Sequence, residues 1–231
     1  WTAERSVGVT GELLDSIGRP YLRVLIVSGA GKHFCAGADI NMMRDAGAKT
    51  AEENREDSAR LDQLFNGLWS HPCFTIGAVQ GVALGGGAGL IACMDHVIAT
   101  SDIKIALSEG KLGILPAVIG PYVYRRVGSA CFRRLAMQAS RIEAEEAQRV
   151  GMIEQVVNSV DDLPAAVDAM VSEVIVSSTE YCSDPPEVLN DGTCNFDGHC
   201  TDGNWANQSA MSGAGEIWAG YSLSTASTVG C

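Results

Sequence analysis

The chain has 231 residues, which is enough to bury a substantial core in one layered α/β domain. Its net charge of −12 comes without a basic patch, so we expect no binding to nucleic acid. The sequence has no apolar run long enough to span a membrane and no basic segment before a hydrophobic core at its start, so we expect neither a membrane span nor a signal peptide.

Predicted helices and strands alternate along most of the chain. An amphipathic helix at 2–18 precedes a β-branched strand at 22–28, and because a βαβ fold normally opens with a strand, we expect that an N-terminal strand is missing. A long amphipathic helix is predicted at 50–68, with Leu61, Leu64, Phe65 and Leu68 on its inner face. Further strands are predicted at 74–79, 95–100, 103–107 and 152–157, and further helices at 120–128, 130–137, 140–150 and 161–174.

The C-terminal part differs from the rest in composition. Residues 1–149 hold all 16 Lys and Arg together with 16 Asp and Glu, whereas residues 150–231 hold 12 acidic residues and no basic ones. From Tyr181 onward there is no helical or alternating apolar period, and Gly, Ser, Thr, Asn and Asp dominate. We therefore expect a domain at 1–175 and an acidic tail at 176–231 that is irregular or disordered.

The cysteines fall into two groups of four. Those in apolar surroundings are expected to be thiols of the core, namely Cys35, Cys73, Cys93 and Cys131. Those of the tail resemble a loose disulfide set or a metal site, namely Cys182, Cys194, Cys200 and Cys231. The spacing of the second group fits no common zinc pattern, so we expect no metal.

The most informative stretch runs from Phe74 to Pro116. A buried-strand pattern leads into the glycine run Leu84-Gly85-Gly86-Gly87-Ala88-Gly89, which then turns apolar again, as expected for a strand, a glycine turn and a helix start. The first amides of a helix are unpaired and lie at the positive end of its dipole, so this turn can hold an oxygen that develops negative charge. Glu109 follows between two apolar segments. An oxyanion site followed by a half-buried acid indicates enolate chemistry.

A second loop rich in small residues, Gly29 to Ile40, leaves the strand at 22–28. It is either an ordinary βα loop with Asp39 as a helix N-cap or the source of a second amide for the oxyanion. Neither glycine loop matches a P-loop or a dinucleotide-binding fingerprint.

Four segments, HFCAGADI, ALGGGAGLIACMD, LSEGKLGILP and ASRIEAEEAQRVGMIEQVV, occur in one order across roughly residues 2–175. Together they resemble the crotonase superfamily, the enoyl-CoA hydratases and isomerases. Within it, GLIACMD followed by LPAVIGPYV is most similar to the 3-methylglutaconyl-CoA hydratase branch.

The resemblance implies a spiral of ββα repeats with two sheets ringed by helices, and a homotrimer or hexamer as the assembly. The C-terminal helices expected of such a fold are atypical here. It also implies that the backbone amides of Ala38 and Gly86 hold the thioester oxygen of an acyl-CoA, with no cofactor other than the CoA of the substrate. Further contacts to the acyl-CoA are expected from Ala36, Asp39, Ile40, Gly85, Leu112 and Pro116.

By the same resemblance, Glu109 exchanges the proton at the α-carbon or its vinylogous position. Hydratases with two glutamates carry the first at the position of Gly89, where this chain has no side chain. We therefore expect a hydratase that adds water across a branched or glutaconyl-type enoyl-CoA with Glu109 alone. The alternatives are a Δ3,Δ2-enoyl-CoA isomerase and a non-catalytic acyl-CoA-binding protein. The expected location is the cytoplasm, or the mitochondrial matrix if the N-terminus was trimmed.

Overall fold

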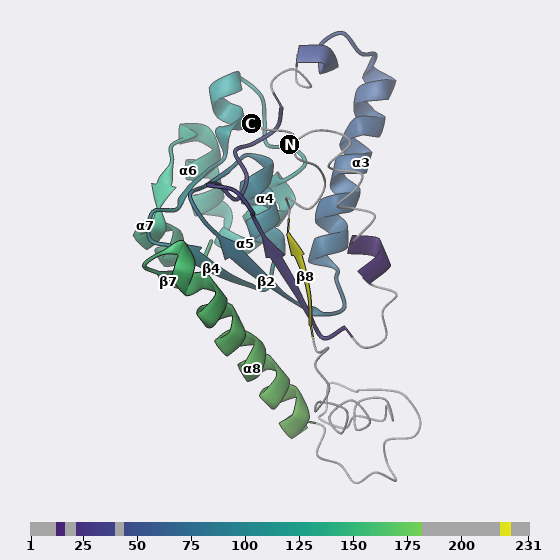
Figure 1. The fold of residues 1–231 in the computed structure, drawn as a ribbon. Helices are drawn as coiled ribbons and strands as arrows, with labels where there is room; N and C mark the ends of the chain where they lie inside the picture. The colour runs from purple at the N-terminus through teal and green to yellow at the C-terminus, as the bar shows by residue number, and fades with distance from the viewer. Residues whose placement is uncertain (1–12, 17–21, 40–43, 182–217, 223–231) are drawn as a thin grey trace.

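The larger of two sheets is parallel and lies at the centre of the molecule. The computed structural model describes residues 13–16, 22–39, 44–181 and 218–222. Within these residues the sheet has five strands in the order β7-β4-β2-β1-β8 (Figure 1). Every neighbouring pair is parallel. The strands are β1 (Val24–Ser28), β2 (Phe74–Val79), β4 (His96–Thr100), β7 (Gln155–Val157) and β8 (Trp218–Ser222).

A smaller sheet carries the chain into the glycine turn. Its strands are β3 (Val82–Leu84), β5 (Lys104–Ala106) and β6 (Ile142–Glu143). Strand β5 is central, pairing in parallel with β3 and antiparallel with β6. The glycine turn and the segment of Glu109 follow β3 and β5, and because these two strands are parallel, both segments leave the sheet at the same edge.

The helices cover both faces of the larger sheet (Figure 1). Helix α3 (Ala51–Trp69) begins with a capping box between Thr50 and Glu53, which pairs amides that would otherwise lack partners. Further helices are α4 (Gly86–Cys93), α5 (Gly120–Val127), α6 (Ser129–Gln138), α7 (Ala144–Arg149) and α8 (Leu163–Tyr181), with the 3₁₀ turns η1 (Ser108–Leu112) and η2 (Val160–Asp162). Residues 13–16 and 44–46 are also helical.

Strand β1 shows how the sequence divides the core. Val24 and Ile26 face a cluster that includes Leu163 of α8, whereas Leu25 and Val27 face the cluster formed by α3, α4 and α5. Successive side chains of a strand point to opposite faces, so an unbroken apolar run is what a strand buried on both faces requires. The strand predicted at 22–28 is confirmed, and the structure adds that it lies inside the sheet with both faces covered.

Most predicted elements are present, and the differences involve short or C-terminal segments. The predicted helix at 140–150 begins with strand β6, and α7 starts at Ala144. Helix α8 continues to Tyr181, beyond the predicted end at 174. Strand β8 lies in the tail, for which irregular structure was expected. It forms by pairing with β1, a contact between distant parts of the chain that composition does not predict. The tail cysteines and Ile40 lie outside the described residues.

Candidate active site

Two loops that are far apart in sequence lie side by side before α4. Cys35 forms a parallel bridge with Ala83, its amide donates to Val82 O at 3.0 Å, and its carbonyl accepts from Leu84 N at 2.9 Å. A β-carbon at Gly87 would lie 2.8 Å from Cys35 Cβ, so the loops approach this closely only because residue 87 is glycine. The loop that carries Ala38 is thereby held beside the start of α4, and Ala38 is exposed.

The turn into α4 depends on Gly85. Its φ of 54° and ψ of −117° are a conformation that residues with a β-carbon rarely adopt. Its amide donates to Ala106 O at 2.9 Å, and its carbonyl accepts from Ala88 N and Gly89 N at 2.9 and 3.1 Å. Gly86 is the first residue of the helix, so its amide has no acceptor within the helix. The turn therefore presents an N–H at the positive end of α4.

Glu109 lies against this turn. It belongs to η1, and a β-carbon at Gly85 would lie 3.1 Å from Glu109 Oε1 and 3.2 Å from Ser108 Oγ. Glu109 Oε2 is buried and has no hydrogen-bond partner among the described residues. Desolvation raises the pKa of the Glu109 carboxyl, against a smaller opposing effect of its hydrogen bond with its own amide. A carboxyl of raised pKa that keeps one oxygen without a partner is suited to proton transfer.

Gly89 lies one helical turn after Gly85, and the side of α4 on which its side chain would lie is packed against hydrocarbon. A β-carbon there would lie 2.4 Å from Ile119 Cγ2, 2.8 Å from Ile119 Cβ and 3.0 Å from Phe65 Cε1. Ile119 and Phe65 are 3% and 1% exposed. The space into which a side chain at position 89 would point is therefore filled, and no second acid fits there without movement of the backbone around Ile119.

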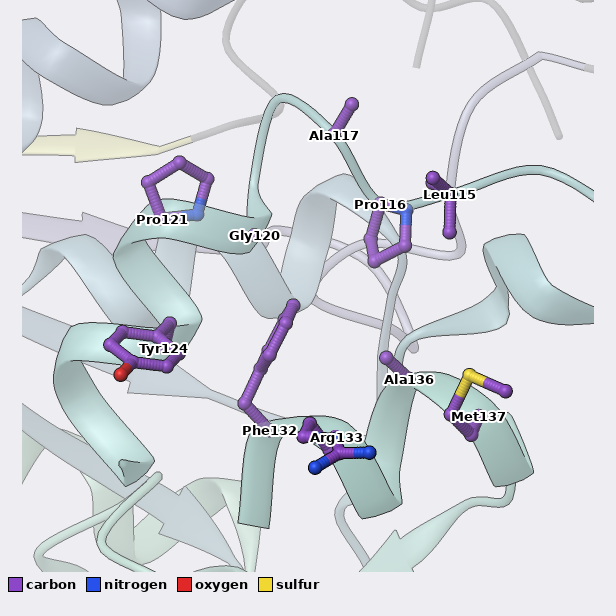
Figure 2. Close-up of a pocket in the computed structure, with 10 residues that line it drawn as sticks. All are labelled: Leu115, Pro116, Ala117, Gly120, Pro121, Tyr124, Phe132, Arg133, Ala136 and Met137. Atoms are coloured by element: carbon purple, nitrogen blue, oxygen red, sulfur yellow. The ribbon is translucent and has the colours of Figure 1, made fainter. Parts of the chain in front are cut away.

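An apolar groove of about 490 Å³ opens beyond η1, between the segment 115–121 and helix α6. Figure 2 shows the ring of Phe132 rising from α6 toward Gly120, with Tyr124 beside it. These two rings meet edge to face, with centroids 6.0 Å apart. Phe132 and the 82%-exposed Met137 also line the groove, and neither was predicted as a site residue, because their spacing of five residues is not the spacing of one helical face.

The other predicted contact residues are spread around these features. Ala36 is exposed, Asp39 is half-buried and Gly85 is buried. Leu112 is 60% exposed at the end of η1, and Pro116 is buried and lines the groove. Leu112, Pro116 and Glu109 thus lie on one continuous segment.

The four cysteines among the described residues serve packing. Cys35 and Cys93 are buried, Cys73 and Cys131 are half-buried, and all four are reduced. Burial raises the pKa of Cys73 and of Cys93, so neither is a reactive thiolate. Within the described residues, no group of His, Cys, Asp and Glu side chains could hold a metal ion. None of the described helices is long and apolar enough to cross a membrane.

Solved structures share this arrangement of sheets and helices. A crystal structure of an enoyl-CoA hydratase from Shewanella pealeana ATCC 700345 superposes with a TM-score of 0.70 at 31% identity, covering 92% of this chain and 79% of that one. Pseudomonas aeruginosa AtuE gives a TM-score of 0.74 at 29% identity, covering 94% of this chain and 76% of that one. The fold is therefore the α/β crotonase fold.

The family described as enoyl-CoA hydratase/isomerase matches residues 10–183, and the chain belongs to it. A crotonyl-CoA hydratase from Syntrophomonas wolfei subsp. wolfei (strain DSM 2245B / Goettingen) is 38% identical over 147 residues, which are 63% of this chain and 55% of that protein. The chain spans between 48% and 60% of the length of the first curated relatives that it matches.

Proposed function

We propose that the protein adds water across the double bond of an α,β-unsaturated acyl-CoA, with Glu109 as the acid and base. The observation that carries this proposal is the buried, unpartnered Glu109 Oε2 beside the turn that begins α4. The amides of Ala38 and Gly86 would hold the thioester oxygen. The family and the relatives that are named hydratases support this class of chemistry.

One carboxylate can complete the addition. Glu109 takes a proton from a water molecule as the water oxygen forms a bond to the β-carbon. The electron pair of the carbon–carbon double bond moves toward the thioester, whose oxygen becomes the enolate oxygen and is held by the two amides. Glu109 then gives its proton to the α-carbon, the thioester carbonyl reforms, and one water molecule has been added in total.

The amides are expected to contribute more to the rate than proton transfer does. A fixed donor aimed at developing negative charge contributes about 3–4 kcal/mol in comparable sites. The proposal for the Gly86 amide is supported by its position at the start of a helix and by the hydrogen bonds that hold Gly85 before it. The raised pKa of Glu109 then brings the carboxyl closer to neutrality, where it can both accept and donate a proton.

The finer features of the function are also proposals. The apolar lining of the groove at Pro116 and Phe132 suits a branched acyl chain, and Arg133, which also lines the groove, could pair with the free carboxylate of a glutaconyl-type chain, as in the 3-methylglutaconyl-CoA hydratase branch. CoA enters as part of the substrate, and no further cofactor is needed for the steps above. A homotrimer or hexamer in the cytoplasm or mitochondrial matrix completes the proposal.

Isomerisation is the second candidate, and the hydrocarbon beside Gly89 favours it. Glu109 would take a proton from the α-carbon of a 3-enoyl-CoA and return it to the γ-carbon, so that the double bond moves to the 2-position. This reaction needs one carboxylate and no water.

Separate incubation with 2-enoyl-CoA and 3-enoyl-CoA distinguishes the candidates when the products are identified by mass and chromatography. A hydratase increases the mass of the 2-enoyl-CoA by one water, whereas an isomerase converts the 3-enoyl-CoA at constant mass. Tight acyl-CoA binding without either product would contradict both candidates and indicate a binding protein.

A further inference from the structure

We propose that Ile119 determines the reaction specificity of this site, by setting how much of the enolate chemistry leads to hydration and how much to migration of the double bond. The inference rests on the proposed function and concerns the same site. It is carried by the way in which Ile119 fills the space beside Gly89.

Glu109 and Ile119 are the two ends of one segment that passes across the start of α4. Glu109 lies against Gly85, and Ile119 lies against Gly89, whose amide bonds to the Gly85 carbonyl one helical turn away. The segment is held at both ends, because Ile114 N donates to Glu109 O at 3.2 Å and Gly120 N donates to Pro116 O at 2.7 Å. One segment of backbone thus places Glu109 and Ile119 against α4 at positions one helical turn apart.

Ile119 itself has little freedom to move. It is the N-cap of α5, and its carbonyl accepts from Val123 N at 3.1 Å. The first turn of α5 is tied to α3 by a hydrogen bond of 2.9 Å from Tyr122 Oη to Asp62 Oδ1. The side chain of Ile119 is therefore a fixed wall of the site, since α5 cannot shift without breaking these contacts.

This wall removes polar partners from one side of the site. Phe65 continues it, because its ring lies 3.0 Å from a β-carbon placed at Gly89 and 3.7 Å from one placed at Gly86. An ordered water needs two or more polar partners, and hydrocarbon provides none. On this side of Gly86 an attacking water is not held, so Glu109 must both activate the water and transfer its proton. Migration of the double bond needs only a proton shift along the acyl chain, so it does not require a water molecule to be held.

The test is the ratio of hydrated to migrated product in variants that open the wall. In the double variant Gly89→Glu with Ile119→Gly, a carboxylate can occupy the vacated space, and glycine is well tolerated at an N-cap. We expect the ratio to rise at least about tenfold, and the pH–rate profile to gain a second titrating acid. If the first double variant does not fold, the double variant Gly89→Ser with Ile119→Gly, which has a smaller side chain at position 89, provides the same measurement. It should also raise the ratio of hydrated to migrated product.

The control is Val160→Gly, which removes a 53%-exposed valine from η2, away from the site, and should leave the ratio unchanged. A folded double variant with the wild-type ratio would overturn the role of Ile119 and leave the proposed function intact. If wild-type protein forms neither product, the proposed function fails. The melting temperatures of Gly89→Ala variants then test, without any activity, whether Ile119 fills the space beside Gly89. Gly89→Ala should lower Tm more in the wild-type background than in the Ile119→Gly background, where only the milder contact with Phe65 remains. Equal losses in both would show that Ile119 does not fill this space.

Discussion

Two glutamates of this chain are placed in opposite ways. Glu154, just before β7, is paired with Arg126, whose Nη2 lies 2.7 Å from Glu154 Oε1, and its Oε2 accepts from Val97 N at 2.7 Å. Arg126 also donates to Gly151 O at 2.9 Å and to Met94 O. Glu109 has a buried carboxylate oxygen with no partner among the described residues.

The difference separates a carboxylate that joins elements of the fold from one whose oxygen stays available for the proposed proton transfer. The Glu154 group connects α4, α5 and β7, so its charge is neutralised and its oxygens are occupied. Glu109 Oε2 is desolvated without a hydrogen-bond partner, which costs stability, and desolvation outweighs the carboxyl's hydrogen bond with its own amide and raises its pKa. Uncompensated polar groups at a cleft are characteristic of functional sites.

The largest expected effect is on turnover when Glu109 loses its charge. Glu109→Gln keeps the shape of the side chain but cannot exchange a proton, so kcat should fall by about 10³-fold. Steady-state kinetics with the preferred enoyl-CoA and calorimetry with a saturated acyl-CoA provide the measurement. Binding should change by less than about twofold, since the carboxylate is not needed to hold CoA. Glu145→Gln, at an exposed position of α7, is the control and should match wild type.

The next largest effect is on stability when Arg126 is removed. Arg126→Met leaves Glu154 and two carbonyl oxygens without their donor, and should lower the free energy of unfolding by about 3 kcal/mol. Urea denaturation measures this change, with the exposed Arg141→Met as a control. A loss no larger than that of the control would mean that the Arg126–Glu154 pair does not hold these elements together.

Neutralising each glutamate in turn should shift stability in opposite directions. Glu154→Gln weakens charge-assisted hydrogen bonds and should cost about 1–2 kcal/mol. Glu109→Gln removes a partly desolvated charge and should stabilise by less than about 1 kcal/mol at neutral pH, because solvent screens a half-exposed group. Parallel denaturation of both variants makes the measurement. Destabilisation by Glu109→Gln would imply an unseen partner for its carboxylate.

The smallest effect is a shift in pH dependence. The raised pKa of Glu109 means that the folded chain holds this proton more tightly than the unfolded chain does. Its contribution to stability is present at low pH and is lost as pH rises through the folded-state pKa. The stabilisation by Glu109→Gln should therefore grow with pH over that window. The acid limit of kcat/KM should likewise lie above the ordinary pKa of a glutamate. Thermal melts and rate profiles from acid to neutral pH check both statements.

The sequence predicts the parts of this site that depend on local chemistry. The glycines at Gly85 and Gly86 indicate a helix-starting turn, and the apolar flanks of Glu109 indicate its desolvation; the structure has both. Strands β3 and β6 were missed because three and two residues are too few for an alternating pattern. The contact of Ile119 with Gly89 joins segments thirty residues apart, so only the packing of α5 on α4 reveals it.

The most direct test of the account is proton exchange at the α-carbon of a saturated acyl-CoA in deuterated water, followed by mass spectrometry. The reaction requires only the oxyanion donors and a base, so it does not depend on whether hydration or isomerisation follows. We predict that wild-type protein incorporates deuterium and that Glu109→Gln binds the same thioester without exchange. Exchange at the wild-type rate in Glu109→Gln would contradict the central role of Glu109.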